Sequence, residues 1–377
     1  MNKYKLSIVI PTKNRQFYCI KAVEQVLKYT SENVQIIIQD NSDDSKIIES
    51  YIKRIKSDRL VYNYTKKVLS FVDNFSEAIS LASGLYICMI GDDDGVLTNI
   101  ESMVDYCIKN DIDCYAPSQN VVYIWPNENP IIKNAENGYL CISNVSASQN
   151  NVDCEFVLKK LIKQGFQDYQ KLDVPRLYHG LVKKEILERI KKKTGHYFGG
   201  LTPDMYMIVA LCVECKKVVS SKKPVTISGI CPGSGSSASA TGKHTGKLEE
   251  APHFIGHTQY LWDERVPKIY TVETIWADTG LHALNDFGKS DVSALFDSKK
   301  FLSSLSVKYP QFKEEYKEYR TLYGRDNILR PFVIKINSLK DFVLKIFRKI
   351  FRKKGAVRKY YNVIDIESAT QIILKEI

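Results

Sequence analysis

The chain has 377 residues, 44% hydrophobic and 26% charged, which is typical of a globular protein with length for one large domain or two ordinary ones. No stretch approaches the roughly 18 consecutive apolar residues of a membrane-spanning helix, and the apolar run after Lys5 is too short for a signal-peptide core. The net charge is +11, but the segment from Lys335 to Lys359 carries +9 of it, so the chain does not resemble a protein that binds nucleic acid over its whole surface.

The first hundred residues alternate short apolar runs with segments of helical periodicity. The apolar runs predict strands at 6–10, 34–38, 60–64 and 86–90. Apolar residues three or four apart predict helices at 18–28, 47–55 and 72–82. This alternation predicts an α/β fold with a mostly parallel sheet covered by helices. Ligands of such sheets bind at the carboxyl ends of the strands, where polar clusters occur here at 11–15, 40–44 and 92–94.

The pattern after residue 116 is less regular. It predicts strands at 121–125 and 176–182 and helices at 156–163, 183–193 and 205–215. The Gly/Ser/Thr-rich stretch 231–247 predicts a loop, and helical segments rich in Trp, Tyr and Leu follow at 259–284.

Three adjacent acids, Asp92, Asp93 and Asp94, directly follow the predicted strand at 86–90. Adjacent carboxylates repel one another, which costs stability unless a cation or hydrogen-bond donors offset the charge. At an extended strand end Asp92 and Asp94 point the same way, and oxygen ligands of this kind suit Mg²⁺ or Mn²⁺. The alternative is a solvated acidic turn that caps the next helix.

The polar clusters after the first two strands also have local explanations. Asp40-Asn41-Ser42-Asp43-Asp44 is typical of a turn whose acid caps a helix, and a turn with a cap also explains Pro11-Thr12-Lys13-Asn14-Arg15. In a binding site, Asp40 would accept a hydrogen bond from a nucleotide base or a ribose hydroxyl. The combination of three clusters in this order favours a site over three unrelated turns.

These segments resemble family 2 glycosyltransferases with the GT-A fold. Ser7–Arg15 is similar to their first strand and loop, Asp40–Ser42 to the acidic turn after the second strand, Ala82–Ile87 to the approach to the metal motif, and Gly91–Asp94 to their DxD signature. The resemblance covers about the first hundred residues and implies a Mn²⁺ or Mg²⁺ cofactor and an inverting single displacement. Many relatives have an acid at the position of Gly91, so the division of roles among the three carboxylates stays open.

The resemblance implies two sets of site residues. Those for the nucleotide-sugar donor are Pro11, Thr12, Asn14, Arg15, Asp40, Asn41, Asn74, Asp92 and Asp93. Those for the metal are Asp94 and Asp92.

The segment Gly200-Leu201-Thr202-Pro203-Asp204-Met205 resembles a Ser/Thr-Pro-Asp segment of some bacterial surface-polysaccharide transferases in this family. There the acid occupies the position of the catalytic base, so Asp204 is the candidate base. The alternative is that Asp204 only caps the helix that begins at Met205.

Three further residues are candidates for the acceptor site or a lid. Lys243 and His244 lie in the loop 231–247, whose backbone N–H groups could cover the donor phosphates, although a plain surface loop explains this composition equally well. His179 is a candidate acceptor residue, while a single His at a strand end is more often structural.

The C-terminal segment combines an apolar face with a strongly cationic one. Apolar residues recur at helical spacing, namely Ile336, Leu339, Val343, Ile346, Phe347 and Ile350. Lys and Arg cover much of the rest, which predicts a helix in the interface of an anionic membrane. The alternatives are a helix packed on the domain or a nucleic-acid tail, and the phenylalanines at 342, 347 and 351 favour the membrane over the nucleic acid.

Nine cysteines are scattered without regular spacing, and several lie in apolar runs. They indicate reduced thiols and hence a cytoplasmic location. Cys212 and Cys215 form the only CxxC, for which two cysteines on a buried helix face are a better explanation than zinc.

Together these features predict a GT-A catalytic domain at 1–230, with the nucleotide-sugar side at about 1–116 and the acceptor side at about 117–230. A flexible loop and helical subdomain would follow at 231–330, and a membrane-associating tail at 331–377. The predicted function is transfer of a sugar from a nucleotide sugar, with UDP as the expected nucleotide, to a glycan or polyprenyl-linked acceptor at the inner face of a bacterial cell membrane.

Two alternatives remain at this level. A nucleotidyltransferase acting on a sugar phosphate usually begins with a Gly-rich phosphate loop, which is absent here. A non-catalytic basic membrane-binding protein explains the tail but not the three acids.

Overall fold

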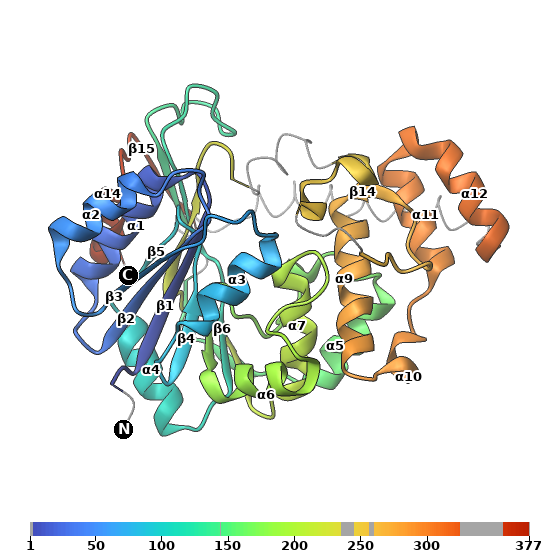
Figure 1. Ribbon diagram of the computed structural model, residues 1–377, viewed down its shortest axis with the longest axis horizontal. Helices are drawn as coiled ribbons and strands as arrows, with labels where there is room; N and C mark the ends of the chain where they lie inside the picture. The colour runs from blue at the N-terminus through green and yellow to red at the C-terminus, as the bar shows by residue number, and fades with distance from the viewer. Residues whose placement is uncertain (1–2, 144, 235–244, 256–259, 325–356, 377) are drawn as a thin grey trace.

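A computed structural model describes residues 3–143, 145–234, 245–255, 260–324 and 357–376 (Figure 1). Its largest sheet has eight strands in the order β3-β2-β1-β4-β10-β6-β11-β9. Their bounds are β1 Leu6–Thr12, β2 Val34–Asp40, β3 Leu60–Tyr64, β4 Tyr86–Met89, β6 Cys114–Pro117, β9 Gln149–Asn151, β10 Leu181–Lys183 and β11 Val218–Ser221. The neighbouring strands β3, β2, β1 and β4 pair in parallel, and β10 is antiparallel to both of its neighbours, β4 and β6.

Helices cover both faces of this sheet. The helices of the N-terminal part are α1 Gln16–Tyr29, α2 Lys46–Ile55, α3 Phe71–Ser80, α4 Ile100–Lys109, α5 Cys154–Lys163, α6 Lys184–Thr194 and α7 Pro203–Glu214. In β1 the side chains alternate between the faces, so Ile8 packs with α1, α2 and α4, whereas Val9 packs with α3, α5 and α7. A strand that is buried on both faces reads as a continuous apolar run, which explains why these strands were predictable.

A second sheet has five strands in the order β15-β8-β7-β12-β5. Their bounds are β5 Gly95–Val96, β7 Val121–Ile124, β8 Tyr139–Ser143, β12 Thr226–Ile230 and β15 Val357–Tyr361. The remaining elements are β13 Thr245–Lys247, β14 Ile269–Thr271, α9 Val272–Asp286, α10 Ser290–Ser293, α11 Ser298–Lys308, α12 Lys313–Tyr323 and α14 Ile366–Glu376, with short 3-10 helices at Tyr169–Lys171, Leu248–Glu250, Pro252–Phe254 and Pro310–Phe312.

The predicted elements hold with three local differences. The strand predicted at 176–182 is reduced to β10, because His179 has a left-handed backbone (φ 62°) that ends any extended run. The end of the predicted loop 231–247 forms β13, which pairs with β14. The helical segments predicted at 259–284 contain one helix, α9, which begins at Val272 with a capping box between Thr271 and Thr274.

The core does not divide at residue 230. A single hydrophobic cluster joins α5, α6 and α7 to α9, α11 and α12, and α7 and α9 pack side by side (Figure 1). The region predicted as a separate helical subdomain therefore shares the core of the catalytic part.

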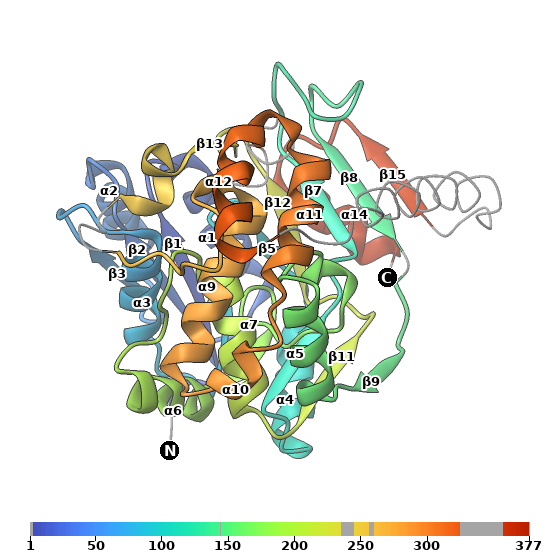
Figure 2. The same ribbon diagram turned by 90° about the vertical axis from the view of Figure 1, so that its right-hand side faces the viewer.

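Residues 357–376, part of the tail predicted at 331–377, pack against the rest of the described chain. The predicted amphipathic helix from Lys335 to Lys354 lies outside the described residues, but β15 pairs with β8 and α14 packs on α1 (Figure 2). Val363, Ile366 and Ile373 enter the core of the second sheet, since their spacing gives α14 an apolar face. In the described part of the chain, no helix has the length and apolar character that crossing a membrane requires.

Candidate active site

The acid triplet lies where the two sheets meet. It follows β4 of the first sheet and precedes β5 of the second, and β5 pairs with β12. Asp92, Asp93 and Asp94 are each at most 4% exposed. The structural alternative of a solvated acidic turn is therefore wrong, because three carboxylates are buried here and must be compensated from within the protein.

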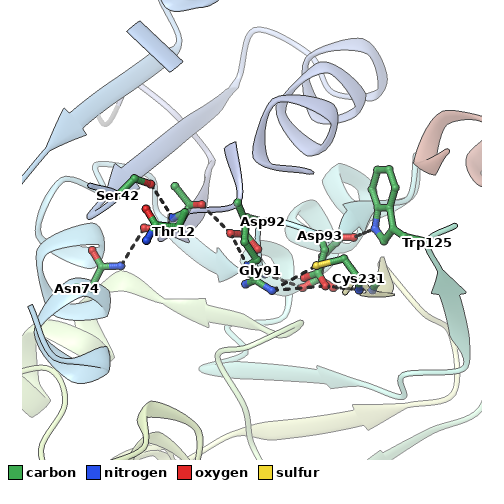
Figure 3. Close-up of polar contacts among 12 residues, drawn as sticks. Thr12, Ser42, Asn74, Gly91, Asp92, Asp93, Trp125 and Cys231 are labelled. Carbon is green, nitrogen blue, oxygen red and sulfur yellow. Dashed lines mark hydrogen bonds and ion pairs between the residues drawn. The ribbon is translucent and has the colours of Figure 1, made fainter. Parts of the chain in front are cut away.

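Asp92 is held by the loop after β1 (Figure 3). Its Oδ2 accepts hydrogen bonds from Thr12 Oγ1 at 2.6 Å and from Arg15 Nε at 3.0 Å, and its Oδ1 lies 2.5 Å from an Arg15 terminal nitrogen. This two-point contact is the strong form of an arginine–carboxylate pair. Burial raises the pKa of Asp92 above its ordinary range, and Arg15 opposes that rise.

Asp94 is the most fully engaged of the three. Its carboxylate accepts the backbone N–H groups of Gly91 and Gly229, each at 2.6 Å, and the hydroxyl of Tyr178 at 2.8 Å. Burial raises the pKa of Asp94, and these three donors favour its ionised form. The carboxylate thus ties β12 to the end of β4.

Asp93 has fewer partners (Figure 3). Its Oδ2 accepts the backbone N–H of Cys231 at 2.9 Å and lies 3.8 Å from Arg15, while its backbone oxygen accepts the indole N–H of Trp125 at 2.8 Å. The backbone is therefore anchored by the second sheet, and the carboxylate is the least committed of the triplet.

Most of the predicted donor residues surround this point. Pro11 and Thr12 end β1, and the N–H of Asn14 donates to Ser42 Oγ at 2.8 Å, which joins the loops after β1 and β2. Asn74 lies beside Thr12, and its Oδ1 is buried without a hydrogen-bond partner among the described residues. A buried acceptor of this kind is available to a ligand.

The side chains of Asp40 and Asn41 are hydrogen-bonded to other residues of the protein. The carboxylate of Asp40 is fully buried and accepts the N–H of Ser42 and the hydroxyl of Tyr62. The amide of Asn41 donates to the backbone oxygens of Thr65 and Lys67. Both side chains shape the loop around the predicted donor site.

Asp204 lies across from the triplet at the start of α7. It lines a cavity with Tyr169, Arg176 and Tyr178. Thr202, the N-cap residue of α7, makes no capping hydrogen bond with its side chain, and neither does Asp204 among the hydrogen bonds of the described chain. Burial raises the pKa of Asp204 to about 6; Arg176 lowers it and Asp94 raises it further. An acid with a pKa close to neutrality has the property that a general base needs.

His179 is buried next to the triplet and does not face an open acceptor site. Its Nδ1 lies 2.9 Å from Thr226 Oγ1 and its Nε2 lies 3.4 Å from Asp94. Burial lowers the pKa of His179 to about 3, so the ring is neutral at physiological pH. Lys243 and His244 lie outside the described residues.

The sequence alone did not single out Arg176, Tyr178, Cys231 or Trp125. Tyr178 neighbours the candidate His179, and Cys231 begins the predicted loop, but only the fold brings them to the acids. No local pattern marks these residues, because their contacts with the acids join positions 32 to 138 residues apart in the chain.

A divalent ion at this point would need ligands from the substrate. Among the described residues, no three His, Cys, Asp or Glu side chains are grouped to hold a metal. The two predicted ligands already have partners: Asp92 is paired with Arg15, and Asp94 accepts hydrogen bonds from three donors. Mg²⁺ and Mn²⁺ are commonly bound by one or two carboxylates together with substrate phosphates, an arrangement with which a single carboxylate, Asp93, is compatible.

The structure confirms the predicted α/β fold with a largely parallel sheet, and the acid triplet follows β4 of that sheet. Residues 7–169 match the model of "Glycosyl transferase family 2". The site residues Arg176, Tyr178 and Asp204 lie beyond the matched segment.

Several bacterial transferases are similar over parts of the chain. Glycosyltransferase GlyG of Streptococcus pneumoniae is 30% identical over 29% of this chain and 36% of its own length. A GalNAc(5)-diNAcBac-PP-undecaprenol beta-1,3-glucosyltransferase of Campylobacter jejuni is 29% identical over 25% of this chain and 31% of its own. The Escherichia coli UDP-Glc:alpha-D-GlcNAc-diphosphoundecaprenol beta-1,3-glucosyltransferase WfgD is 28% identical over 35% of this chain and 51% of its own. The chain thus spans about a third to a half of these relatives.

Among solved structures, S. aureus TarS 1-349 in complex with UDP-GlcNAc superposes with a TM-score of 0.49 at 12% identity, covering 96% of this chain and 98% of TarS 1-349.

Proposed function

We propose that this protein transfers a sugar from a UDP-sugar to a glycan or lipid-linked saccharide acceptor in the synthesis of a bacterial surface polysaccharide. The observation that carries the proposal is the buried Asp92–Asp94 triplet at the end of β4, together with Asp204 at the start of α7, whose pKa the charge of Asp94 raises. The named activities of the Campylobacter and Escherichia relatives, both of which act on undecaprenol-linked acceptors, support the acceptor class.

In the proposed reaction Asp204 removes the proton of the acceptor hydroxyl. The hydroxyl oxygen bonds to the anomeric carbon as the bond from that carbon to the diphosphate breaks, and UDP leaves with inversion at the carbon. Arg15 lies beside the acids as a fixed positive charge, and fixed charges aimed at a developing anion lower the barrier without reorganising. A divalent ion, when bound, supplies further positive charge to the leaving phosphate.

We propose Asp93 as the ligand of that ion, in place of Asp94 and Asp92. Its carboxylate accepts one backbone N–H, whereas each of the other two holds several donors. A ligand that is already saturated by hydrogen bonds must give them up before it can coordinate a metal, which costs free energy.

Nucleotide binding tests the proposal directly. UDP, GDP and CMP are compared by thermal shift with and without Mn²⁺, because a ligand that binds only the folded state raises the melting temperature. We expect a metal-dependent shift with UDP. No shift with any nucleotide, in a folded sample, would instead favour a non-catalytic binding protein.

We also propose that the basic segment at 335–354 holds the protein on the inner face of the cell membrane. The segment is flanked by α12 and β15, so deletion of everything after residue 334 would also remove β15 and α14 from the second sheet. The better test replaces Lys345, Arg348 and Lys349 by Gln, with Lys191–Lys193 at the exposed end of α6 replaced as the matched control.

Each basic residue near an anionic surface contributes about 1 kcal/mol, so three substitutions should weaken binding to phosphatidylglycerol vesicles about 100-fold. The α6 control should bind almost as wild type does. Equal losses in the two variants would show that net charge, and not this segment, governs binding.

A further inference from the structure

Arg176 differs from Arg15 in that no acid of the described chain forms an ion pair with it, although the charges of Asp173 and Asp204 act on it. It lies in the loop before β10 and lines a cavity with Asp204, Tyr169, Tyr178 and Gln119. Within the described chain no carboxylate lies within 4.0 Å of its guanidinium, and its Nε is buried without a hydrogen-bond partner. Arg15, in contrast, holds Asp92 at two points.

Arg176 is partly buried, and its buried Nε has no hydrogen-bond partner in the described chain, which is costly for a charged group. Burial lowers the pKa of Arg176, with Tyr169 the largest of the groups that oppose the change. A charge taken out of water without a partner costs several kcal/mol, so a protein rarely keeps one unless something else pairs with it. The planar fork of arginine matches the two oxygens of a carboxylate or phosphate.

Constrained backbone flanks two of the residues that line this cavity, Tyr169 and Tyr178. Phe166 (φ 59°) and Asp168 (φ 56°) precede Tyr169, and His179 (φ 62°) follows Tyr178, all three in the left-handed region. Gly180 lies so close that an added Cβ would be 1.9 Å from the backbone oxygen of Arg176. Strain of this kind persists where the surroundings fix a functional geometry.

The cavity also has a size and a place that bear on its ligand. Its volume is about 30 Å³, room for roughly two water molecules or the oxygens of one small anionic group. Tyr178 connects it to the acid triplet, since Tyr178 lines the cavity and its hydroxyl donates to Asp94. The candidate base Asp204 lines the same cavity, which puts it on the acceptor side.

We propose that Arg176 binds an anionic group of the acceptor, a carboxylate or a phosphate, and thereby places the acceptor hydroxyl against Asp204. This inference rests on the proposed function and names the chemical class of its acceptor. The acceptor sugar then carries a negative charge close to its reacting hydroxyl, and a neutral analogue leaves Arg176 unpaired.

The test uses the full chain saturated with UDP and Mn²⁺, so that the donor site is closed to the probes. Glucuronate, glucose 6-phosphate and glucose are titrated by calorimetry into wild type, Arg176→Gln, Arg176→Lys and the control Arg54→Gln, a surface arginine on α2. A charge-assisted hydrogen bond contributes about 1.5–3 kcal/mol, so wild type and the control should bind at least one anionic probe about tenfold or more tightly than glucose.

Arg176→Gln should bind all three probes alike, and Arg176→Lys should recover part of the preference because it restores the charge without the fork. Preference for glucuronate identifies a carboxylate, and preference for glucose 6-phosphate a phosphate. Equal binding of all probes by wild type, or a preference that survives in Arg176→Gln, overturns the inference. The UDP-dependent thermal shift must persist in every variant; its absence in wild type would mean that the proposed function itself had failed.

Discussion

Replacement of Asp204 by Asn should make the protein more stable while it removes the activity. The folded structure raises the pKa of Asp204 from 3.8 to about 6, mainly through burial. An acid whose pKa is higher in the folded than in the unfolded chain binds its proton more tightly when folded, so its ionised form costs folding free energy. This cost is absent below about pH 4, grows between pH 4 and pH 6, and is complete at pH 8.

The size of the effect follows from the shift. About two pKa units at 1.36 kcal/mol each give about 3 kcal/mol, an upper bound because Asp204 keeps some contact with solvent. With an unfolding entropy of about 2.1 cal/mol/K per residue, this is about 4 °C in melting temperature for a chain of this length.

The assay is a melting curve of wild type and Asp204→Asn at pH 8 and at pH 4. The gain should appear at pH 8 and vanish at pH 4, where the acid of wild type is itself neutral. Asp173→Asn, an exposed acid in the neighbouring loop, should melt as wild type does at both values. A variant that is less stable than wild type at pH 8 would refute the assignment of Asp204 as a carboxylate whose ionised form costs folding free energy.

Three other predictions concern the same site. The kcat/KM of sugar transfer should fall as pH drops through about 6, because the base must be ionised, and pH–rate profiles measure this. Asp93→Asn should abolish the Mn²⁺-dependent part of the UDP thermal shift, and a normal Mn²⁺ response in this variant would exclude Asp93 as the metal ligand. Asp94→Asn should lower the free energy of unfolding by about 2 kcal/mol, because the new amide N–H would face the backbone N–H groups that donate to Asp94. Gly229→Ala should remove UDP binding, since its Cβ would lie 1.8 Å from the backbone oxygen of Asp93, while Gly246→Ala, with its nearest neighbour at 3.9 Å, should bind normally.

The N-terminal half of the fold was predictable because its signals are local. The strand at 60–64 matches β3 at both ends, and β1, β2 and β4 match within two residues, since each is an apolar run that ends at a turn. The acid triplet could be found for the same reason: three carboxylates after a buried strand are visible in the sequence.

What could not be predicted depends on contacts between distant segments. The backbone N–H groups of Gly229 and Cys231 donate to acids about 135 residues earlier, and no local sequence pattern around them indicates these hydrogen bonds. No sequence pattern indicates Arg176 either, because what distinguishes it is a buried Nε without a hydrogen-bond partner among the described residues, which depends on the packing of the folded chain. The pairing of β15 with β8 likewise joins segments more than 200 residues apart. The basic segment before β15 favours a membrane-binding tail in the sequence, whereas β15 itself is an edge strand.

The docking of α14 has a consequence for how the protein is made. Gln25 on α1 bridges the backbone of Val96, two residues after the acid triplet, to Thr370 on α14, 345 residues later in the chain. At about 5–20 residues per second, the ribosome needs roughly 17 to 70 s to synthesise this interval. In the later part of that time, once β11 has been synthesised, the nascent chain has its acids and its first sheet but not the segment that covers the second sheet. Chaperones would therefore meet a catalytic half with an open apolar surface, and the site would be completed only when residues 357–376 emerge.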